Sequence, residues 1–90
     1  MNQIVTTPAF ERRLKKFLKK HPDMQAPLKK VLKMIQLNQL GHPSLRLHKI
    51  EGKNCHSVSL NMSYRLMVEI RIKQDGTVLL IDIGNHDDVY

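Results

Sequence analysis

The residues of this chain best suited to chemistry lie in and just after two stretches of alternating apolar sequence. His86 falls within the segment 82–90, which also carries three carboxylates and a phenol. A histidine can donate or accept a proton near neutral pH because its unperturbed pKa lies closest to that range. Arg65, in the preceding stretch, is permanently charged and can bind a phosphate through two parallel hydrogen bonds. The pair therefore suggests acid/base chemistry on a phosphate ester.

Each of these two residues also has an ordinary structural interpretation. Arg65 could be a surface arginine that forms an ion pair with Glu69 or Asp82. His86 could be a solvated residue of a polar tail. The sequence leaves both alternatives open, because it does not show which side chains converge in space.

A second candidate histidine, His48, stands in a basic run before the strand-forming half of the chain. Arg46, Lys49 and Lys53 flank it. Such a run could bind an RNA backbone while the imidazole acts as a base or orients one. A solvated sheet edge explains the same residues. His56, by contrast, falls on the apolar side of its alternating stretch, where we expect a histidine of the core or its boundary.

Neither a metal site nor a cofactor is predicted. The adjacent Asp87 and Asp88, taken with Asp82, lack a recognised metal-binding spacing, and no cysteine and histidine grouping has the spacing of a zinc site. The single cysteine, Cys55, cannot form an internal disulfide, which is typical of a reducing compartment. It has no obvious activating neighbour beyond the adjacent histidine.

Length and charge restrict the class of protein. Ninety residues predict one domain, 1–90, with a thin core. The net charge of +7, from 15 Lys and Arg against 8 Asp and Glu, favours a polyanionic partner. Two Phe, two Tyr and no Trp leave little for base stacking, so RNA contacts would depend mainly on phosphates.

We find no signal peptide and no apolar run long enough for a membrane span, and expect a cytoplasmic protein without membrane contact.

The periodicity of apolar residues predicts an α+β fold with the element order β-α-α-β-β-β. Apolar residues recur at helical spacing in two segments and alternate in the strand segments. The predicted elements are a strand at 3–6, helices at 8–20 and 24–39, and strands at 54–62, 64–72 and 77–83. We expect a helical hairpin packed on one side of a small, mostly antiparallel sheet whose other face is partly polar.

The same alternation predicts which side chains face the core. In 64–72 it points Arg65 away from the core, on the side opposite to Leu66. In the last strand it groups Ile81 with Ile83 on one face and leaves Asp82 on the other. The segment 73–76 ends in Asp-Gly and predicts a tight hairpin turn.

Taken in order, these motifs resemble the RelE/ParE superfamily of type II toxin-antitoxin toxins, and particularly its RelE-like and YafQ-like mRNA interferases. The resemblance rests on the helical hairpin and on four segments that follow it. These are Leu47-His48-Lys49-Ile50-Glu51-Gly52, Ser57-Val58-Ser59-Leu60, Tyr64-Arg65-Leu66, and Asp82-Ile83-Gly84-Asn85-His86-Asp87-Asp88-Val89-Tyr90. The resemblance implies a ribosome-dependent endoribonuclease that cuts mRNA and an antitoxin protein that silences it in a hetero-oligomeric complex.

The resemblance also implies roles for individual residues. Arg65 matches the strand arginine that stabilises charge on the scissile phosphate, and His86 matches the C-terminal histidine that acts as general acid. His48 matches the histidine before the sheet, and Tyr90 lies where RelE-like members carry an aromatic residue. Two YafQ-type residues, a strand histidine and a nearby aspartate, are replaced by serines at positions 59 and 63.

The implied reaction is metal-independent cleavage through the RNA 2′-hydroxyl. His48 or Asp82 would remove the hydroxyl proton, and His86 would protonate the leaving 5′-oxygen. Arg65, with Lys49 or Lys53, would balance the charge of the phosphorane. Two alternatives stay open. ParE-like relatives share the fold but poison DNA gyrase, and a decayed toxin would retain only antitoxin binding.

Overall fold

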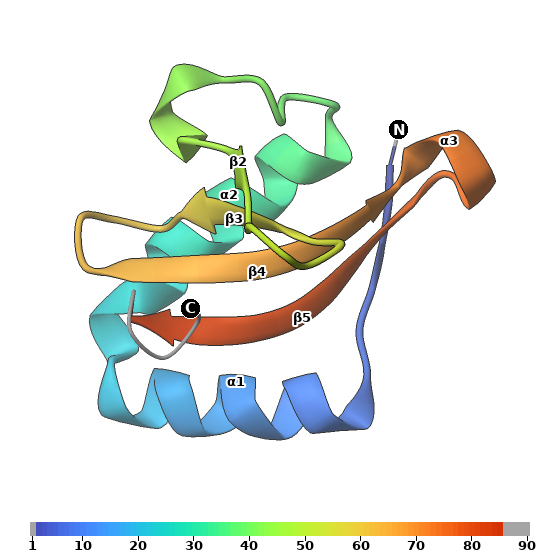
Figure 1. The fold of residues 1–90 in the computed structure, drawn as a ribbon. Helices are drawn as coiled ribbons and strands as arrows, with labels where there is room; N and C mark the ends of the chain where they lie inside the picture. Colours follow the sequence, from blue (N-terminus) through green and yellow to red (C-terminus); the bar gives the residue numbers. More distant parts are fainter. Residues whose placement is uncertain (1, 86–90) are drawn as a thin grey trace.

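The structure is a computed structural model that describes residues 2–85, and it confirms the α+β class (Figure 1). Its helices are α1 (Pro8–Lys20), α2 (Gln25–Gln36) and the short α3 (Ile72–Asp75), with 3₁₀ turns η1 (Pro22–Met24) and η2 (Pro43–Leu45). Its strands are β1 (Gln3–Val5), β2 (His48–Lys49), β3 (His56–Ser59), β4 (Tyr64–Arg71) and β5 (Thr77–Asn85). None of the described helices is long and apolar enough to cross a membrane.

The five strands form one sheet in the order β1-β5-β4-β3-β2. Neighbouring strands are antiparallel except for β1, which pairs in parallel with the first residues of β5. The expected mostly antiparallel sheet is therefore confirmed, with one additional two-residue strand. Strand β2 was not predicted, because a strand of two exposed residues is defined by its pairing with β3 and leaves no alternating pattern.

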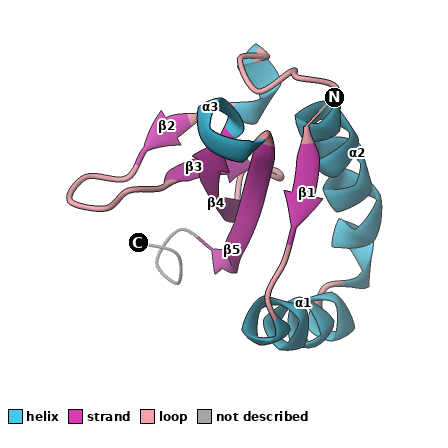
Figure 2. Ribbon diagram, turned by 90° about the vertical axis from the view of Figure 1, so that its right-hand side faces the viewer, coloured by secondary structure: helices cyan, strands magenta, loops and turns pink. Residues whose placement is uncertain are grey.

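The N-terminal half forms the two predicted helices. Thr7 caps α1, since its hydroxyl oxygen accepts a hydrogen bond of 3.1 Å from the Phe10 N–H, and Pro8 occupies the first turn. Pro27 is tolerated in α2 because it lies in the opening turn, where its missing N–H costs no helical hydrogen bond. Figures 1 and 2 show α1 running alongside β5 and α2 lying across one face of the sheet.

The main core lies between this helical layer and the sheet. Phe10 of α1 and Ile35 of α2 are fully buried against Val58, Leu66 and Val78 of the three central strands. As predicted, Leu66 and its alternate neighbours face the helices, so Arg65 points to the other side. We call that other side the open face of the sheet.

The open face carries a small apolar cluster of its own. Ile50, Cys55 and Met67 are buried there, and Ile81 packs against them. Ile50 and Cys55 flank the loop between β2 and β3, which Figure 2 shows extending away from the rest of the sheet. The open face is thus polar only in part, on either side of this cluster.

A β-bulge in β5 corrects the predicted orientation of its side chains. Met67 pairs with Asp82 while Val68 pairs with Leu80, so that Ile81 has no partner on β4. The extra residue reverses the alternation: Val78, Leu80 and Ile83 lie in the main core, whereas Ile81 contacts the cluster on the open face. The grouping of Ile81 with Ile83 was therefore wrong.

Several other boundaries differ from the sequence prediction: α2 ends at Gln36 rather than at residue 39, and β5 continues to Asn85 rather than ending at residue 83. Strand β3 spans only His56–Ser59, and the residues that precede β4 form bends. In place of a tight turn at 73–76, the helical turn α3 leads to Gly76, whose φ of 76° suits a residue without a Cβ atom. These differences change the lengths of the connections and leave the order of the predicted elements intact.

Candidate functional site

The open face holds two rows of paired residues that run across the strands. In the first row His48 pairs with Ser57, Ser57 with Met67, and Met67 with Asp82. In the second row Arg65 lies between Ser59 and Gly84. Because adjacent strands lie about 4.8 Å apart, His48 and Asp82 stand roughly 14 Å apart at their Cα atoms, at opposite ends of the first row.

Arg65 reaches from the second row to the first. Its Nη1 atom donates a hydrogen bond of 3.3 Å to the Ser57 hydroxyl oxygen. Ser57 is completely buried, whereas the Arg65 side chain is half-buried. The guanidinium group therefore lies above β3, on the side of the sheet where β2 carries His48.

The two carboxylates that the sequence offered as partners for Arg65 both bind other arginines. Glu69 accepts a hydrogen bond of 2.9 Å from Arg71 Nε, and this bond, together with the charge of Glu69, raises the pKa of the Arg71 guanidinium. Asp82 forms an ion pair with Arg13. Within residues 2–85 Arg65 thus has no carboxylate partner, and its positive charge is not neutralised by a neighbouring anion.

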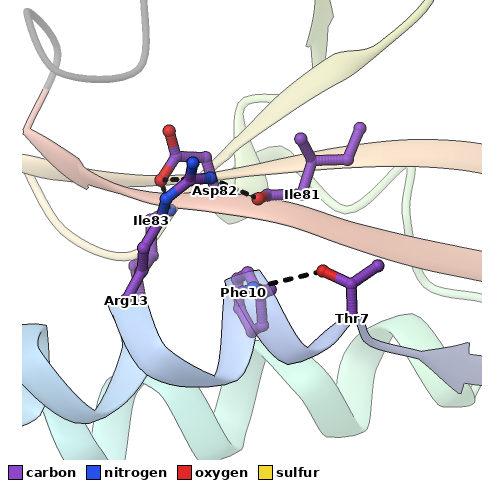
Figure 3. Close-up of polar contacts among 6 residues, drawn as sticks. All are labelled: Thr7, Phe10, Arg13, Ile81, Asp82 and Ile83. Carbon is purple, nitrogen blue, oxygen red and sulfur yellow. Dashed lines mark hydrogen bonds and ion pairs between the residues drawn. The ribbon is translucent and has the colours of Figure 1, made fainter.

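Asp82 is held at the edge of β5 that faces α1 (Figure 3). Arg13 Nη1 lies 3.8 Å from Asp82 Oδ1 and donates a hydrogen bond of 3.4 Å to the carbonyl oxygen of Ile81, the bulge residue. The same carboxylate oxygen accepts a hydrogen bond of 2.8 Å from the Ile83 N–H. Because β1 pairs only with the first part of β5, α1 covers the remaining edge. This placement directs Asp82 away from His48.

His48 has one ring nitrogen oriented by the backbone. Its Nδ1 atom lies 3.3 Å from the carbonyl oxygen of Arg46, an acceptor, so Nδ1 carries the proton in this contact. In the neutral ring Nε2 is then the atom that can accept a proton. Arg46 itself takes a left-handed conformation with φ of 46°, which places its carbonyl next to His48.

The three predicted RNA-binding residues do not all lie beside His48. Arg46 lies two residues from His48 and is exposed. Lys49 pairs with His56, so the alternation of β2 places it on the side opposite to His48. Lys53 is exposed in the loop between β2 and β3. The structure therefore groups His48, Ser57 and Arg65, with Arg46 beside them, and leaves the two lysines farther out.

Two predicted catalytic residues, His86 and Tyr90, lie outside the described residues, as do Asp87 and Asp88. Within the described part of the chain no group of three His, Cys, Asp or Glu side chains is placed to hold a metal ion. His56 is a boundary histidine as expected, since it pairs with Val68 on the helix-facing side and is half-buried, but its buried Nδ1 atom has no hydrogen-bond partner among the described residues.

Sequence reasoning missed two residues of the site. Ser57 anchors Arg65, and Arg13 binds Asp82. The alternation of β3 does place Ser57 on the same face as Arg65, but the contact also depends on the register between β3 and β4. Nothing in the local sequence of α1 indicates that Arg13 would reach the edge of β5.

Comparison with solved structures shows what this architecture resembles. No protein-family model and no curated protein sequence matches the chain. A crystal structure of a metal-bound toxin from Helicobacter pylori superposes with a TM-score of 0.83 and 27% identity, covering 100% of both chains. The E. coli DinJ-YafQ complex gives 0.82 and 19%, covering 100% of this chain and 99% of the other. The YoeB-YefM complex from Staphylococcus aureus gives 0.72 and 18%, covering 96% and 98%.

Proposed function

We propose that this chain, whose fold is that of the RelE-like toxins of type II toxin-antitoxin systems, is itself such a toxin and acts as an mRNA endoribonuclease. The resemblance to these toxins that the sequence motifs indicated is confirmed by the structural neighbours. Cleavage of RNA by this chain is our inference. It depends on the arrangement of its own side chains on the open face.

The observation that carries the proposal is the state of Arg65. Its guanidinium group donates to a neutral hydroxyl, that of Ser57, while Glu69 and Asp82 are taken by other arginines. A half-buried cation that has no carboxylate partner within residues 2–85 is suited to an incoming phosphate, because none of the described anions has to be displaced. A purely structural arginine would be expected to use one of the two available carboxylates.

The proposed reaction is attack of a ribose 2′-oxygen on the adjacent phosphorus. His48 Nε2 accepts the proton of the 2′-hydroxyl, and Arg65 stabilises the additional negative charge of the pentacoordinate phosphorane. The bond between phosphorus and the 5′-oxygen then breaks, and that oxygen takes a proton from a general acid. The products are a 2′,3′-cyclic phosphate and a 5′-hydroxyl.

We assign the general acid to His86, which follows Asn85 at the end of the described chain. The bulge at Ile81 supports this assignment, because it places Gly84 on the open face directly opposite Arg65. His86 is two residues beyond Gly84 in the sequence. Of the two candidate bases, His48 is favoured over Asp82, since the latter is bound by Arg13 at the edge of β5, at the other end of the row from His48.

The partners we propose are mRNA on the ribosome and an antitoxin protein, in the cytoplasm. The net charge of +7 favours both a polyanionic RNA and an acidic protein segment. Two of the similar structures are complexes, DinJ-YafQ and YoeB-YefM, and we infer a corresponding antitoxin partner for this chain. Tyr90, Arg46 and Lys53 are proposed as further RNA contacts.

The test is inducible expression of the wild type and of His86→Ala and Arg65→Ala, with the 5′-ends of cellular mRNA mapped within minutes of induction. We expect growth arrest and cuts inside translated reading frames for the wild type, and neither for the two variants. The variants must accumulate in folded form to the wild-type level.

Two results would contradict the proposal. Growth arrest with DNA damage and intact mRNA would identify a gyrase poison instead. Absence of arrest from a folded wild-type protein would identify a chain that has lost the activity and retains at most antitoxin binding.

A further inference from the structure

A cavity of about 370 Å³ opens at the end of the sheet, on the helix-facing side. The end of α1 provides one wall with Lys16, Lys20 and His21, and the sheet provides the other with Tyr64 and Gly84. Apart from Gly84, none of these residues has a role in the proposed cleavage. The cavity thus combines aromatic rings and cations that this reaction does not use.

The rings in this cavity form one cluster. The His21 and Tyr64 rings lie 4.6 Å apart at their centroids, inclined at 46°, and Phe17 meets the Tyr64 ring edge-on at 5.2 Å. A hydrogen bond of 3.3 Å between the Tyr64 hydroxyl and His21 Nδ1 holds the pair together. His21 and Tyr64 are both half-buried, so part of each ring is accessible from the cavity. Two of the four Phe and Tyr residues in the chain are thus concentrated here.

Two lysines border the same cavity. Lys16 and Lys20 are four residues apart in α1 and therefore lie on the same side of the helix. Both are exposed. Proteins that bind single-stranded nucleic acids combine ring surfaces with exposed cations, since every base has a face for stacking and every nucleotide carries a phosphate.

The cavity adjoins the proposed cleavage site through two backbone connections. Tyr64 immediately precedes Arg65 in β4, so their side chains point to opposite faces of the sheet. Gly84, which lines the cavity, pairs with Arg65 across the two strands. A chain that passes over this end of the sheet would contact Arg65 on one side and Tyr64 on the other.

We propose that this cavity binds a nucleotide of the RNA substrate next to the cleaved phosphate. Its base stacks on the ring pair of His21 and Tyr64, and its phosphate is bound by Lys16 and Lys20. The inference rests on the proposed ribonuclease function and adds a second point of contact with the same strand. The ring cluster favours RNA over an acidic peptide, for which the two lysines alone would suffice.

The test measures binding of a short single-stranded RNA in which every 2′-hydroxyl is methylated, so that cleavage through the 2′-oxygen is blocked. Fluorescence anisotropy gives its dissociation constant for the wild type, Tyr64→Leu and the double variant Lys16→Gln/Lys20→Gln. The matched control is Lys29→Gln/Lys33→Gln, which removes the same charge from two exposed lysines of α2. Circular dichroism and thermal unfolding confirm that each variant is folded.

We expect Tyr64→Leu to weaken binding about 5- to 150-fold, the range measured when a stacking side chain is removed. Tyr64→Phe keeps the ring and should recover most of that loss even if the leucine variant is partly unfolded. The lysine pair should weaken binding more than its control does, and the difference should shrink at high salt.

Three outcomes separate this inference from the proposed function. Wild-type affinity in both Tyr64→Leu and the lysine pair, in a protein that still cleaves mRNA, would overturn the nucleotide site alone. Loss of binding to a fluorescent oligoglutamate peptide without loss of RNA binding in the lysine pair would also overturn it, in favour of an acidic protein segment. Weaker RNA binding in both Tyr64→Leu and the lysine pair would support the site even in a protein that proved unable to cleave mRNA.

Discussion

Arg65 and Ser57 form a hydrogen bond of 3.3 Å although they are not directly opposite each other in the sheet: Ser57 pairs with Met67, and Arg65 pairs with Ser59. The arginine therefore extends diagonally across β3 toward β2. This diagonal contact places the guanidinium group closer to His48 than the register alone would.

Arg65→Gln should lower the rate of mRNA cleavage about 10²- to 10³-fold, the usual loss when a group that stabilises transition-state charge is removed. The matched control is Arg71→Gln, on the same strand and the same face, because Arg71 is already paired with Glu69. We expect the control to stay within a few-fold of wild type in a single-turnover assay. Equal losses in the two variants would indicate a general effect of charge.

His48→Gln should lower cleavage more than Asp82→Asn does, by up to about 10²- to 10⁴-fold. Glutamine keeps a hydrogen-bonding side chain but cannot take up the 2′-hydroxyl proton. Asp82 is engaged by Arg13, so loss of its charge removes a partly exposed ion pair, which contributes little to stability. Single-turnover rates of the two variants decide between the candidate bases, and a larger loss in Asp82→Asn would reverse our assignment.

Ser57→Ala should lower kcat about 2- to 13-fold, which corresponds to one hydrogen bond worth about 0.5–1.5 kcal/mol. The arginine remains but loses the hydroxyl that orients it. Ser59→Ala is the control, because the Ser59 hydroxyl donates to the Asn61 carbonyl oxygen at 2.7 Å instead. Any effect of the control should disappear once rates are normalised to the folded fraction.

Asp75 should make the stability of the fold depend on pH in the acid range. Hydrogen bonds from the Thr77 hydroxyl and N–H lower the pKa of Asp75 below its ordinary value of 3.8. A lowered native pKa means that the carboxylate stabilises the fold above pH 3.8, and that this contribution is lost as the pH falls through the native pKa. Urea unfolding of the wild type and Asp75→Asn should differ at pH 7 and converge in strong acid.

Thr7→Ala should lower the free energy of unfolding by about 1 kcal/mol, because the N-cap of α1 loses the oxygen that accepts from Phe10 N–H. Thr7→Ser keeps that oxygen and should retain most of the stability. Urea denaturation at neutral pH measures both. A loss of similar size in the serine variant would assign the effect to the threonine methyl group.

How far the sequence predicts this molecule depends on whether a feature is local. The face of Arg65 was predictable because residues 64–72, apart from Met67, alternate between apolar or aromatic side chains and charged ones. The bulge at Ile81 was not, since Leu79, Leu80 and Ile81 are all apolar and give no sign of a reversal. A period-two pattern locates a side chain only as long as the strand keeps a regular register.

The candidate site was predictable by residue type and only partly by geometry. Histidine and arginine could be selected from their chemistry, but the separation of His48 from Asp82 follows from the strand order, which no local pattern shows. The contact between Arg65 and Ser57 likewise requires the register between β3 and β4. Both depend on long-range pairing that forms only in the folded chain.

The parallel pairing of β1 with β5 also determines when the sheet can be completed during synthesis of the chain. Residues 3–5 pair with residues 77–79, 74 positions later in the chain. At about 5–20 residues per second, a ribosome takes roughly 4–15 s to make that intervening segment. Strand β1 therefore cannot pair until β5 has been synthesised, and β5 is missing from the middle of the sheet until then. A nascent chain of this kind cannot complete its sheet, and so cannot bring Gly84 opposite Arg65, while most of it is still being translated.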